Sequence, residues 1–480
     1  MKRNLLLCIS AVLLSLSGFA QVTTAEISGI VYEDQNLLLP GANVTAVHTP
    51  TGTTYGAVTN FDGRFNLLNL RVGGPYTITV SFVGFKNYII NDINLSLGQT
   101  VNLNIPMVSD AAMLDAVVIS GSRSNVMNSD RTGAETSIGS RELKTLPSIT
   151  RSAADFYRLE PTASSNGSFG GRNDQFNNFS LDGSIFNNPF GLDAATPGGQ
   201  TNAQPVSLDA IDQIQVSTAP YDVTQAGFTG ASVNAVTKSG TNEIKGTVYG
   251  FYRNQDMTGS KVAGDDIFVP DLKQAQYGAS IGGPIVKNKL FYFANFEIDD
   301  REDLGSNFLA SRPGLTGSNV SRVSEEDLRF VSNKLDSLGY KTGDFEKFTH
   351  KTESTKGIFK LDWNASTNHR VAFIYNFLRA SRDVPANREA IGRRGPDLTT
   401  LQFQNSGYRI NNNIDSFLVE LNSNFGDNIS NKFQAGYTFF DDSRDPFSAP
   451  APAISIQKDG VRYIIAGHEP FSINNKLEQN

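Results

Sequence analysis

Cysteine is almost absent from this chain of 480 residues, because the single Cys8 lies in an apolar run near the N-terminus. Tryptophan (1) and methionine (5) are also scarce, and Lys and Arg (41) are outnumbered by Asp and Glu (48), which gives a net charge of −7. The scarcity of cysteine excludes a disulfide framework. The lack of a basic excess argues against nucleic acid as a partner. After the N-terminal region, no apolar run is long enough to cross a membrane as a helix.

What the chain does contain favours β-structure. Phe (32), Tyr (15) and Gly (43) are abundant, and aromatic residues are enriched in strands. The length suffices for roughly two to four domains, so burying a core poses no difficulty. We therefore predict a mainly β protein with several domains.

The N-terminus has the form of a secretory signal peptide over residues 1–20. The basic pair Lys2-Arg3 precedes a short apolar run at 5–16, and small residues follow at 18–20. Cys8 lies inside the run, not just after a cleavage position, which argues against a lipoprotein. An exported chain without a spanning helix is either soluble after export or enters a membrane as a β-barrel.

Residues 21–109 contain short alternating runs divided by turn signals such as Asp62-Gly63. Runs spaced this closely predict a small antiparallel β-sandwich of transthyretin or Ig-like type. The segment resembles the carboxypeptidase-regulatory-like domain, at residues 39–42, 59–65 and 83–85. That resemblance implies a module without catalysis, and we favour a folding and spacing role over ligand binding.

Residues 110–124 form a linker around a short strand-like run, made of Asp115, Ala116, Val117, Val118 and Ile119. A short strand in flexible chain can add to the sheet edge of a partner protein. A buried strand of any fold could contain the same Val-Val-Ile core. We favour the role in binding a partner, because no predicted strand adjoins this run.

Residues 125–242 are irregular and rich in Asn and Gly, with short helices predicted at 141–147 and 152–159. Asp182-Gly183 lies between two alternating runs and predicts a two-residue hairpin turn. Gly170-Gly171 before Arg172 is not a phosphate loop, because no Gly-Lys-Ser/Thr follows it. Two further strands are predicted at 210–218 and 231–238, followed by a turn.

The order of these motifs resembles that of the TonB-dependent receptors, most nearly the Oar-like group with a carboxypeptidase-regulatory N-terminal domain. The motifs are LDAVVISG, ELKTLP, GGR, LDG, PVSLDAIDQIQVSTAPYD and the run ending in VNAVTKSGTN. Ala231 is a small departure, since the family has a second glycine there. The resemblance covers nearly all of the chain after residue 20, and an ordered series is more specific than any single motif.

The resemblance implies a mixed α+β plug at 125–242 inside a transmembrane β-barrel that begins at 243. It implies that 115–119 is the TonB box and that the plug carries the motif residues Gly170, Gly171, Arg172, Asp182 and Gly183. The hinge from plug to barrel would be Ser239, Gly240, Thr241 and Asn242. We expect Arg172 to pair with a carboxylate facing the barrel lumen, such as Glu297; the alternative is a loop arginine in water.

Residues 243–480 read as a series of antiparallel strands of about ten residues, the length that crosses a bilayer when tilted. In one of them Phe359, Leu361 and Trp363 form one face while Lys360 and Asp362 lie on the other. The polar faces would suit a wet lumen, and the aromatic residues an interfacial girdle. The predicted strands are 244–254, 275–283, 289–299, 356–366, 369–380, 414–426 and 431–440.

The two long polar insertions at 299–355 and 383–408 fit extracellular loops. The series has room for roughly eight or nine strands, whereas the resemblance implies a plugged barrel of about 22. The sequence also ends without the aromatic residue expected of such barrels. We therefore expect the chain to be an N-terminal fragment or the product of a truncated reading frame.

One enzymatic pattern is present, His350-Lys351-Thr352-Glu353, with His468 as a distant third zinc ligand. A zinc site needs three ligands that converge from rigid elements. This pattern lies in a predicted polar loop, so we reject it. The acidic pairs Asp265-Asp266 and Asp441-Asp442 lack the pattern of a calcium loop. We expect no catalytic residue, no metal and no cofactor.

Two functions fit these features. The first is an outer-membrane receptor and transporter of a Gram-negative-type bacterium, with its N-terminal domain in the periplasm. Its partners would be TonB with the inner-membrane energising complex, the barrel-assembly machinery, and an extracellular substrate of unknown class. The second is an adhesive or structural envelope protein that uses the sandwich and loops for contacts without transport.

Overall fold

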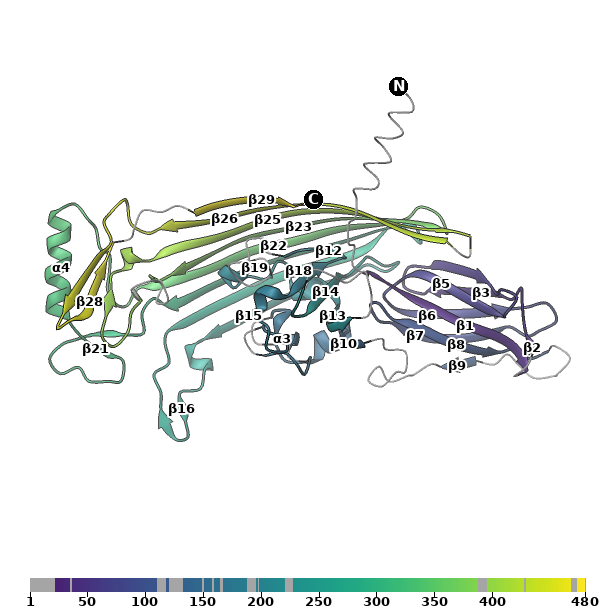
Figure 1. Ribbon diagram of the computed structural model, residues 1–480, viewed down its shortest axis with the longest axis horizontal. Coiled ribbons are helices and arrows are strands. Elements are labelled where there is room, and N and C mark those ends of the chain that lie inside the picture. Colours follow the sequence, from purple (N-terminus) through teal and green to yellow (C-terminus); the bar gives the residue numbers. More distant parts are fainter. Residues whose placement is uncertain are drawn as a thin grey trace, which may run out of the picture.

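A computed structural model of the protein describes most of the chain. The described residues are 22–34, 37–109, 118–120, 133–148, 151–157, 159–164, 167–187, 196, 198–220, 228–386, 395–426, 429–467 and 473–479. The predicted signal peptide at 1–20 and the linker residues Asp115, Ala116 and Val117 lie outside them. Figure 1 shows a β-sandwich at one end, a large sheet along the length of the molecule, and a middle domain against that sheet.

The N-terminal sandwich has the two sheets that the sequence predicts. One contains β1 (Thr24–Asp34), β2 (Leu37–Leu38), β5 (Arg64–Arg71) and β8 (Thr100–Pro106), and the other contains β4 (Thr53–Val58), β3 (Asn43–His48), β6 (Gly73–Ser81), β7 (Tyr88–Leu95) and β9 (Val118–Ser120). Alternate residues such as Val44, Ile78 and Val80 are fully buried between the sheets. The predicted sandwich is confirmed.

β9 corrects one expectation. Val118, Ile119 and Ser120 pair in parallel with Ile89, Ile90 and Asn91 of β7. The run therefore lies beside a strand, and the expectation that nothing adjoins it is wrong. The sequence could not indicate this because the partner strand lies far upstream and belongs to a domain that looks complete without it.

The middle domain contains one five-stranded sheet. Its order is β10 (Gly133–Ile138), β13 (Ile211–Pro220), β14 (Ser232–Thr237), β11 (Asn178–Leu181) and β12 (Ser184–Ile185). β13 and β14 confirm the predicted strands at 210–218 and 231–238. Short helical turns surround the sheet: α2 (Ser140–Thr145), α3 (Ala154–Tyr157), η1 (Asp174–Phe176), η2 (Gly199–Thr201) and η3 (Leu208–Ala210).

The predicted turn at Asp182-Gly183 is also confirmed. Leu181 pairs with Ser184 across it, and the two turn residues have φ values of 49° and 80°. Two successive left-handed residues define the tight hairpin turn whose twist matches that of the strands.

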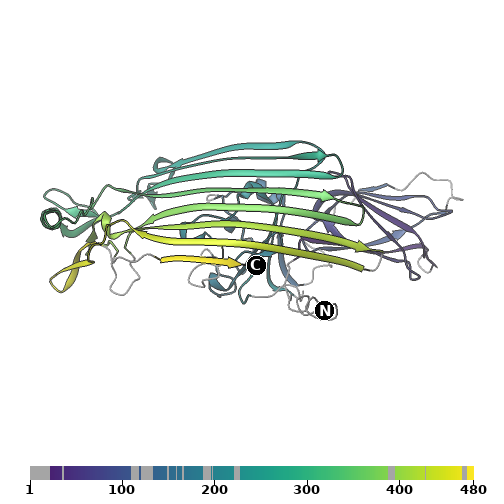
Figure 2. The same cartoon turned by 90° about the horizontal axis from the view of Figure 1, so that it is seen from above.

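The large sheet has eight antiparallel strands (Figure 2), each hydrogen-bonded to the next in the order β15 (Lys245–Asn254), β18 (Leu272–Val286), β19 (Leu290–Leu304), β22 (Thr349–Asn364), β23 (His369–Val384), β25 (Tyr408–Phe425), β26 (Ile429–Pro446) and β29 (Ile473–Gln479). The predicted alternation on β22 is confirmed: Lys360 and Asp362 are 6% and 5% exposed, whereas Phe359 and Trp363 are 39% and 50% exposed.

The predicted strand length is wrong for six strands of the large sheet, which have 15 to 18 residues each: β18, β19, β22, β23, β25 and β26. Polar stretches predicted as loops, such as 299–304 and 349–355, continue the ladder and pair with each other. These stretches pair through backbone hydrogen bonds, which do not depend on the side chains. A strand can therefore continue where the sequence shows no apolar alternation.

The remaining insertions form a cap at the end of the sheet opposite the sandwich (Figure 1). Three separate segments contribute to its core, through Val323, Leu328, Leu401, Phe403 and Ile464. Its elements are β20 (Leu309–Ser311), β21 (Val320–Ser324), α4 (Glu325–Ser337), β24 (Leu401–Gln402), η5 (Gln404–Ser406), β27 (Ile454–Lys458) and β28 (Val461–Ala466). A small hairpin, β16 (Lys261–Val262) and β17 (Asp265–Asp266), follows η4 (Gln255–Met257).

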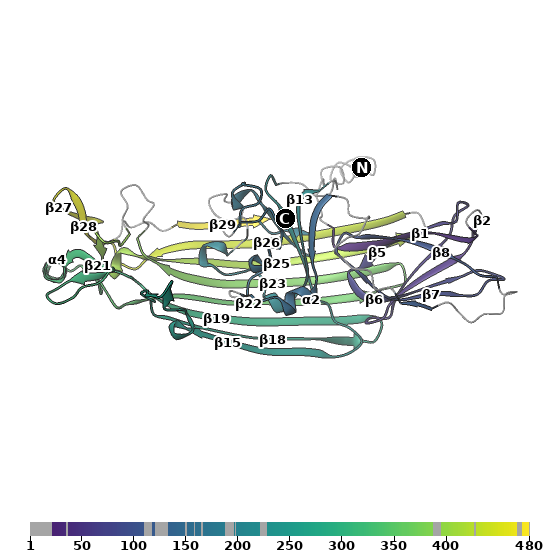
Figure 3. The same cartoon turned by 90° about the horizontal axis from the view of Figure 1, so that it is seen from below.

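Figure 3 shows the middle domain lying across the strands of the large sheet. The two share one hydrophobic core, in which Phe186 and Ile214 of the middle domain pack with Ile374, Leu378 and Phe440 of the sheet. In the described part of the chain, no helix is both long and apolar enough to cross a membrane.

Candidate functional site

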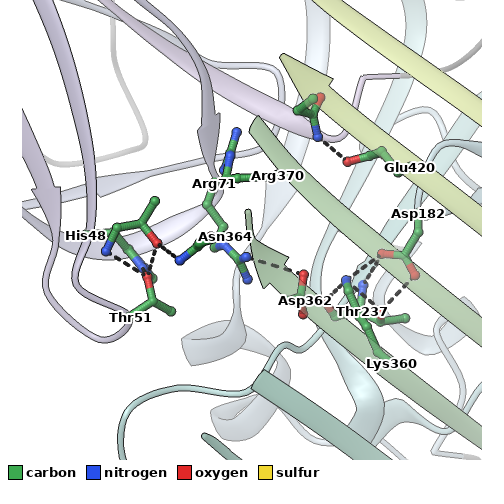
Figure 4. A network of polar contacts seen from close by, with 12 residues as sticks. His48, Thr51, Arg71, Asp182, Thr237, Lys360, Asp362, Asn364, Arg370 and Glu420 are labelled. Atoms are coloured by element: carbon green, nitrogen blue, oxygen red, sulfur yellow. Dashed lines mark hydrogen bonds and ion pairs between the residues drawn. The ribbon is translucent and has the colours of Figure 1, made fainter. Parts of the chain in front are cut away.

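A buried ion pair joins the middle domain to the large sheet. Lys360 Nζ of β22 lies 3.3 Å from Asp182 Oδ1, as Figure 4 shows. The carboxylate of Asp182 also accepts hydrogen bonds from the amide of Thr237 (3.0 Å) and from its hydroxyl (2.7 Å). The hairpin turn places Asp182 at the end of β11, beside β14. A buried charge is tolerated where its partners satisfy it in this way.

A second buried pair lies on the same face of the sheet. Lys356 Nζ is 3.0 Å from Glu297 Oε1, and these side chains are 5% and 0% exposed. They come from directly paired positions of β22 and β19. Glu297 also accepts hydrogen bonds from Ser207 Oγ (2.7 Å) and from the hydroxyl of Tyr249. Because Ser207 begins η3 of the middle domain, this pair also holds the two parts together.

The expected pair between Arg172 and Glu297 is wrong. Arg172 is exposed, while the partners of Glu297 are Lys356, Ser207 and Tyr249. The buried residue of the Arg172 loop is Phe169, which is 1% exposed and accepts a hydrogen bond from the Arg172 amide at 2.9 Å. Gly170 and Gly171 provide this turn, with φ values of 55° and 79°. A tight turn that buries Phe169 leaves the arginine side chain in solvent.

The segment from Ser239 through Thr241 to Asn242 connects β14 to β15 and is closely packed. Gly240 is buried, and a Cβ there would lie 2.4 Å from the Tyr292 carbonyl oxygen and 2.7 Å from that of Gly283. Only glycine fits at that distance. Asn242 Nδ2 donates to Asn288 Oδ1 (2.7 Å), and the Asn242 amide donates to the carbonyl of Pro50 (2.8 Å). The predicted hinge therefore contacts all three parts of the molecule.

The N-terminal sandwich binds the ends of β22, β23 and β25 of the large sheet, and Figure 4 shows some of the side chains involved. Arg71 Nη2 lies 3.3 Å from Asp362 Oδ1 of β22, and Asn364 Nδ2 donates to Thr53 Oγ1 at 2.9 Å. On β23, Arg370 donates to the hydroxyl of Tyr55 and to the carbonyl of Asn69. These contacts join two domains that are about 300 residues apart in sequence.

Further contacts extend this interface to β25 and to the middle domain. Asn69 Nδ2 donates to Asn424 Oδ1 (3.1 Å), and Thr23 Oγ1 donates to Glu420 Oε2 (2.9 Å). Gln213 of β13 accepts from the Leu97 amide (2.9 Å) and donates to the Leu95 carbonyl (3.2 Å).

β22 is the strand of the sheet that contacts both the middle domain and the sandwich through charged side chains. Its inward face carries Lys356, Lys360, Asp362 and Asn364, which contact β19, the middle domain and the sandwich in turn. The sequence placed Lys360 and Asp362 on one polar face and assigned that face to water. The structure gives them protein partners instead. An alternating strand with two lysines and an aspartate facing inward was the available signal, but a polar face does not reveal what covers it.

His48 lies inside the sandwich at this interface. Its Nδ1 is 2.7 Å from Thr51 Oγ1, and its ring centroid is 4.9 Å from that of Tyr76. Burial, together with the positive charges of Arg71 and Arg370, lowers the pKa of His48 from 6.5 to about 3. The imidazole is therefore neutral at physiological pH.

The three parts surround a cavity of about 1060 Å³. The sandwich contributes Gly73 and Leu97, the middle domain Lys144 and Asp212, and the sheet Thr247. Acidic and basic side chains both line the cavity, so it has no single sign of charge.

The rejected zinc pattern does not converge. His350 and Glu353 both lie in β22, and residues three apart in a strand point to opposite faces. His350 is buried against Phe348 and Phe447, at ring distances of 5.4 and 6.3 Å. His468 lies outside the described residues. Among the residues that are described, no group of three or more His, Cys, Asp or Glu side chains is placed to hold a metal ion.

Comparisons with known proteins agree with this architecture. A family described as carboxypeptidase regulatory-like domain matches residues 26–108, and one described as outer membrane beta barrel domain matches residues 236–319. The TonB-dependent transporter Oar of Myxococcus xanthus is 27% identical over 300 residues, which are 58% of this chain and 27% of that protein. By these matches, the chain is similar to the TonB-dependent receptors. Like them, it is a protein of the outer membrane.

A second TonB-dependent receptor, SusC of Bacteroides thetaiotaomicron, is 34% identical over 155 residues, which are 32% of this chain and 14% of SusC. The chain thus spans about a quarter or less of the length of these two receptors. Among solved structures, the outer membrane transporter YddB from Escherichia coli has a TM-score of 0.45 and 14% identity, over 65% of this chain and 39% of YddB. The siderophore receptor PirA from Acinetobacter baumannii has a TM-score of 0.42 and 15% identity, over 72% and 43%.

Proposed function

We propose that this TonB-dependent receptor binds an extracellular substrate and admits it across the outer membrane when TonB remodels the middle domain. The large sheet would be part of the barrel wall, and the middle domain its plug. The cap would then face the outside, and the sandwich the periplasm. The barrel-assembly machinery would be the partner that inserts the wall into the membrane.

The observation that carries this proposal is the way in which the middle domain is attached to the sheet. Besides the shared hydrophobic core, its polar attachments include the carboxylate of Asp182 on Lys360, the hydroxyl of Ser207 on Glu297 and the carbonyl of Pro205 on Asn376. Polar groups can exchange a protein partner for water at a small net change in free energy, typically about 1 kcal/mol for a hydrogen bond. A plug attached in this way can shift when it is pulled and then return to the same contacts.

The pulling point would be the TonB box at 115–119. Its described part, Val118 and Ile119, is already in strand pairing with β7. A strand that pairs through its backbone can be taken over by the strand of another protein, which is the usual form of β-augmentation. TonB, energised by its inner-membrane complex, would then pull on the chain directly before the middle domain.

An adhesive role is the second candidate, and one feature of the cap favours it. Phe330 on α4 is 71% exposed, although the cap has its own core. Exposed apolar side chains mark contact sites for other proteins where they gather into a patch, and Phe330 would be one member of such a patch. In that case the middle domain would have no reason to move.

A cysteine reporter in the middle domain distinguishes the two candidates. Ser217 of β13 is 1% exposed, and among the described residues its hydroxyl has no hydrogen-bond partner, so Ser217→Cys is a mild change. In energised cells that produce the full-length receptor, we expect maleimide to label this cysteine several-fold faster than in cells treated with a protonophore. An exposed reporter, Gly259→Cys, should be labelled at the same rate in both.

Strand pairing by the TonB box should be needed for this response. Val118→Pro removes a backbone donor and disfavours an added strand, so it should abolish the effect of the proton gradient on labelling of Ser217→Cys. Val118→Thr keeps a β-branched residue and should preserve the effect. Labelling that is equal with and without the gradient would favour the adhesive role.

A further inference from the structure

The N-terminal sandwich is attached at a single end of the large sheet. Its partners are Asp362 and Asn364 at the end of β22, Arg370 at the start of β23, and Glu420 and Asn424 near the end of β25. Figure 1 shows that this end lies opposite the cap. If the cap faces outward, the sandwich lies at the periplasmic mouth of the barrel wall.

The sandwich also contacts the middle domain at this mouth. Gln213 of β13 bonds the backbone of Leu95 and Leu97, and Asn234 Nδ2 of β14 donates to the carbonyl of Val22 at 2.6 Å. Val236 of β14 packs in the hydrophobic core of the sandwich. The cavity of about 1060 Å³ lies between the three parts, so the sandwich forms one of its walls.

The contacts with the sheet are polar and can exchange with water. They comprise one ion pair, Arg71 with Asp362, and the hydrogen bonds described above. Arg71 Nε and Nη1 are buried, and among the described residues they have no hydrogen-bond partner. Separation of the sandwich from the sheet would hydrate both nitrogens, which offsets part of the loss of the ion pair. Polar interfaces between domains of one chain commonly open and close.

The sandwich is also joined to the TonB-box segment. β9 (Val118–Ser120) is one edge strand of the sandwich sheet whose other edge strand is β4. Thr53 of β4 accepts a hydrogen bond from Asn364 of the large sheet. A force applied to residues 115–119 therefore acts on the sandwich as well as on the middle domain.

We propose that the N-terminal sandwich is a second gate. When docked on β22, β23 and β25, it closes the periplasmic side of the passage, and it leaves the sheet when TonB pulls. This inference rests on the proposed transport function. It adds a moving part to the plug and gives the sandwich a role beyond that of a spacer.

A cysteine pair across the interface tests the gate. Thr53 Oγ1 and Asn364 Nδ2 are 2.9 Å apart, so Thr53→Cys/Asn364→Cys places two thiols within reach of a disulfide. Within the 480 residues of this sequence, the one other cysteine is Cys8. The control pair Thr45→Cys/Thr79→Cys joins paired residues of β3 and β6 within the sandwich. Both pairs are introduced into the full-length receptor and oxidised briefly in cells.

With the proton gradient present, we expect the disulfide yield of the interface pair to fall at least about twofold relative to protonophore-treated cells, while the control pair is unchanged. The fully oxidised interface pair should also slow labelling of Ser217→Cys, because the sandwich contacts β13 and β14, and a reductant should reverse this. The oxidised control pair should not slow it.

The outcomes separate the gate from the transport function. If Ser217→Cys labelling depends on the gradient but the interface pair gives the same yield in both conditions, the sandwich stays docked and the gate is wrong, while transport stands. If neither reporter responds to the gradient, both proposals fail.

Discussion

Lys360 Nζ of β22 lies 3.3 Å from Asp182 Oδ1 in the turn between β11 and β12, and both side chains are almost fully buried. Two positions further along β22, Asp362 pairs with Arg71 of the N-terminal sandwich. One strand of the sheet thus binds the middle domain and the N-terminal domain through adjacent inward-facing residues. The predictions below test these contacts.

Asp182→Asn should weaken the attachment of the middle domain. It leaves the ammonium of Lys360 buried without its counter-charge, which costs about 3 kcal/mol. Hydrogen–deuterium exchange of the β14 amides in the full chain measures the loss as faster exchange. Asp265→Asn is the control, because Asp265 is exposed in β17 and surface substitutions change stability by at most about 0.5 kcal/mol.

The double variant Asp182→Asn/Lys360→Met tests the cause. Replacing both partners removes the unpaired buried charge, so exchange should return part of the way to the wild-type rate. A double variant that exchanges faster than Asp182→Asn alone would contradict this account of the pair.

Lys356→Ala and Arg172→Ala should differ in their effects. Lys356→Ala leaves Glu297 buried without its cation, which should lower the free energy of unfolding by about 3 kcal/mol. The measurement is the urea concentration at which the amides of β19 and β22 lose half of their protection from hydrogen exchange. Arg172→Ala should change the midpoint by less than the equivalent of about 0.5 kcal/mol, because Arg172 is exposed. An equally large effect of Arg172→Ala would restore the pairing that the sequence suggested.

Gly240→Ala should disrupt the junction between the middle domain and β15. The added methyl group would lie 2.4 Å from the Tyr292 carbonyl oxygen, so the strands must move, at a cost of about 1 to 3 kcal/mol. We expect a lower temperature for loss of folded protein in heat-modifiability gels. Gly259→Ala has open space around the position and should behave like the wild type.

Acid should destabilise the docked sandwich through His48. The folded-state pKa of His48 is about 3, below its ordinary value of 6.5. Between pH 3 and pH 6.5, the unfolded chain therefore binds a proton at His48 that the folded chain does not bind. Stability is therefore complete above pH 6.5 and falls as the pH drops toward 3, by at most about 1.4 kcal/mol per pH unit. The groups around the ring are Arg71, Arg370, Tyr76 and the hydroxyl of Thr51.

His48→Gln removes this titration and keeps a polar side chain. When the pH is lowered from 6.5 to 4.5, the hydrogen–deuterium exchange rate of the β3 and β4 amides, corrected for intrinsic exchange, should rise in the wild type. The rise should be smaller in His48→Gln. Above pH 7 the two proteins should show the same pH dependence. Equal acid sensitivity of both proteins would mean that other groups control it.

The sequence by itself determined most of the fold. Alternation with period two, divided by Gly, Pro and Asp-Gly turns, identified the sandwich, the hairpin at Asp182-Gly183 and the inward and outward faces of β22. These features are local, because a strand's alternation and a turn's left-handed residues depend on neighbours within a few positions. The ordered motifs also identified the receptor family.

Only the tertiary structure decided which side chains meet. Arg172 and Glu297 have opposite charges and were therefore a reasonable pair. Glu297 instead forms an ion pair with Lys356 of the adjacent strand, and Arg172 lies on a turn whose buried side chain is that of Phe169. The contact of Arg71 with Asp362 joins residues about 290 positions apart, and β9 pairs with a strand of another domain. Such contacts depend on how whole domains pack, and a polar face on a strand is the same in sequence whether water or protein covers it.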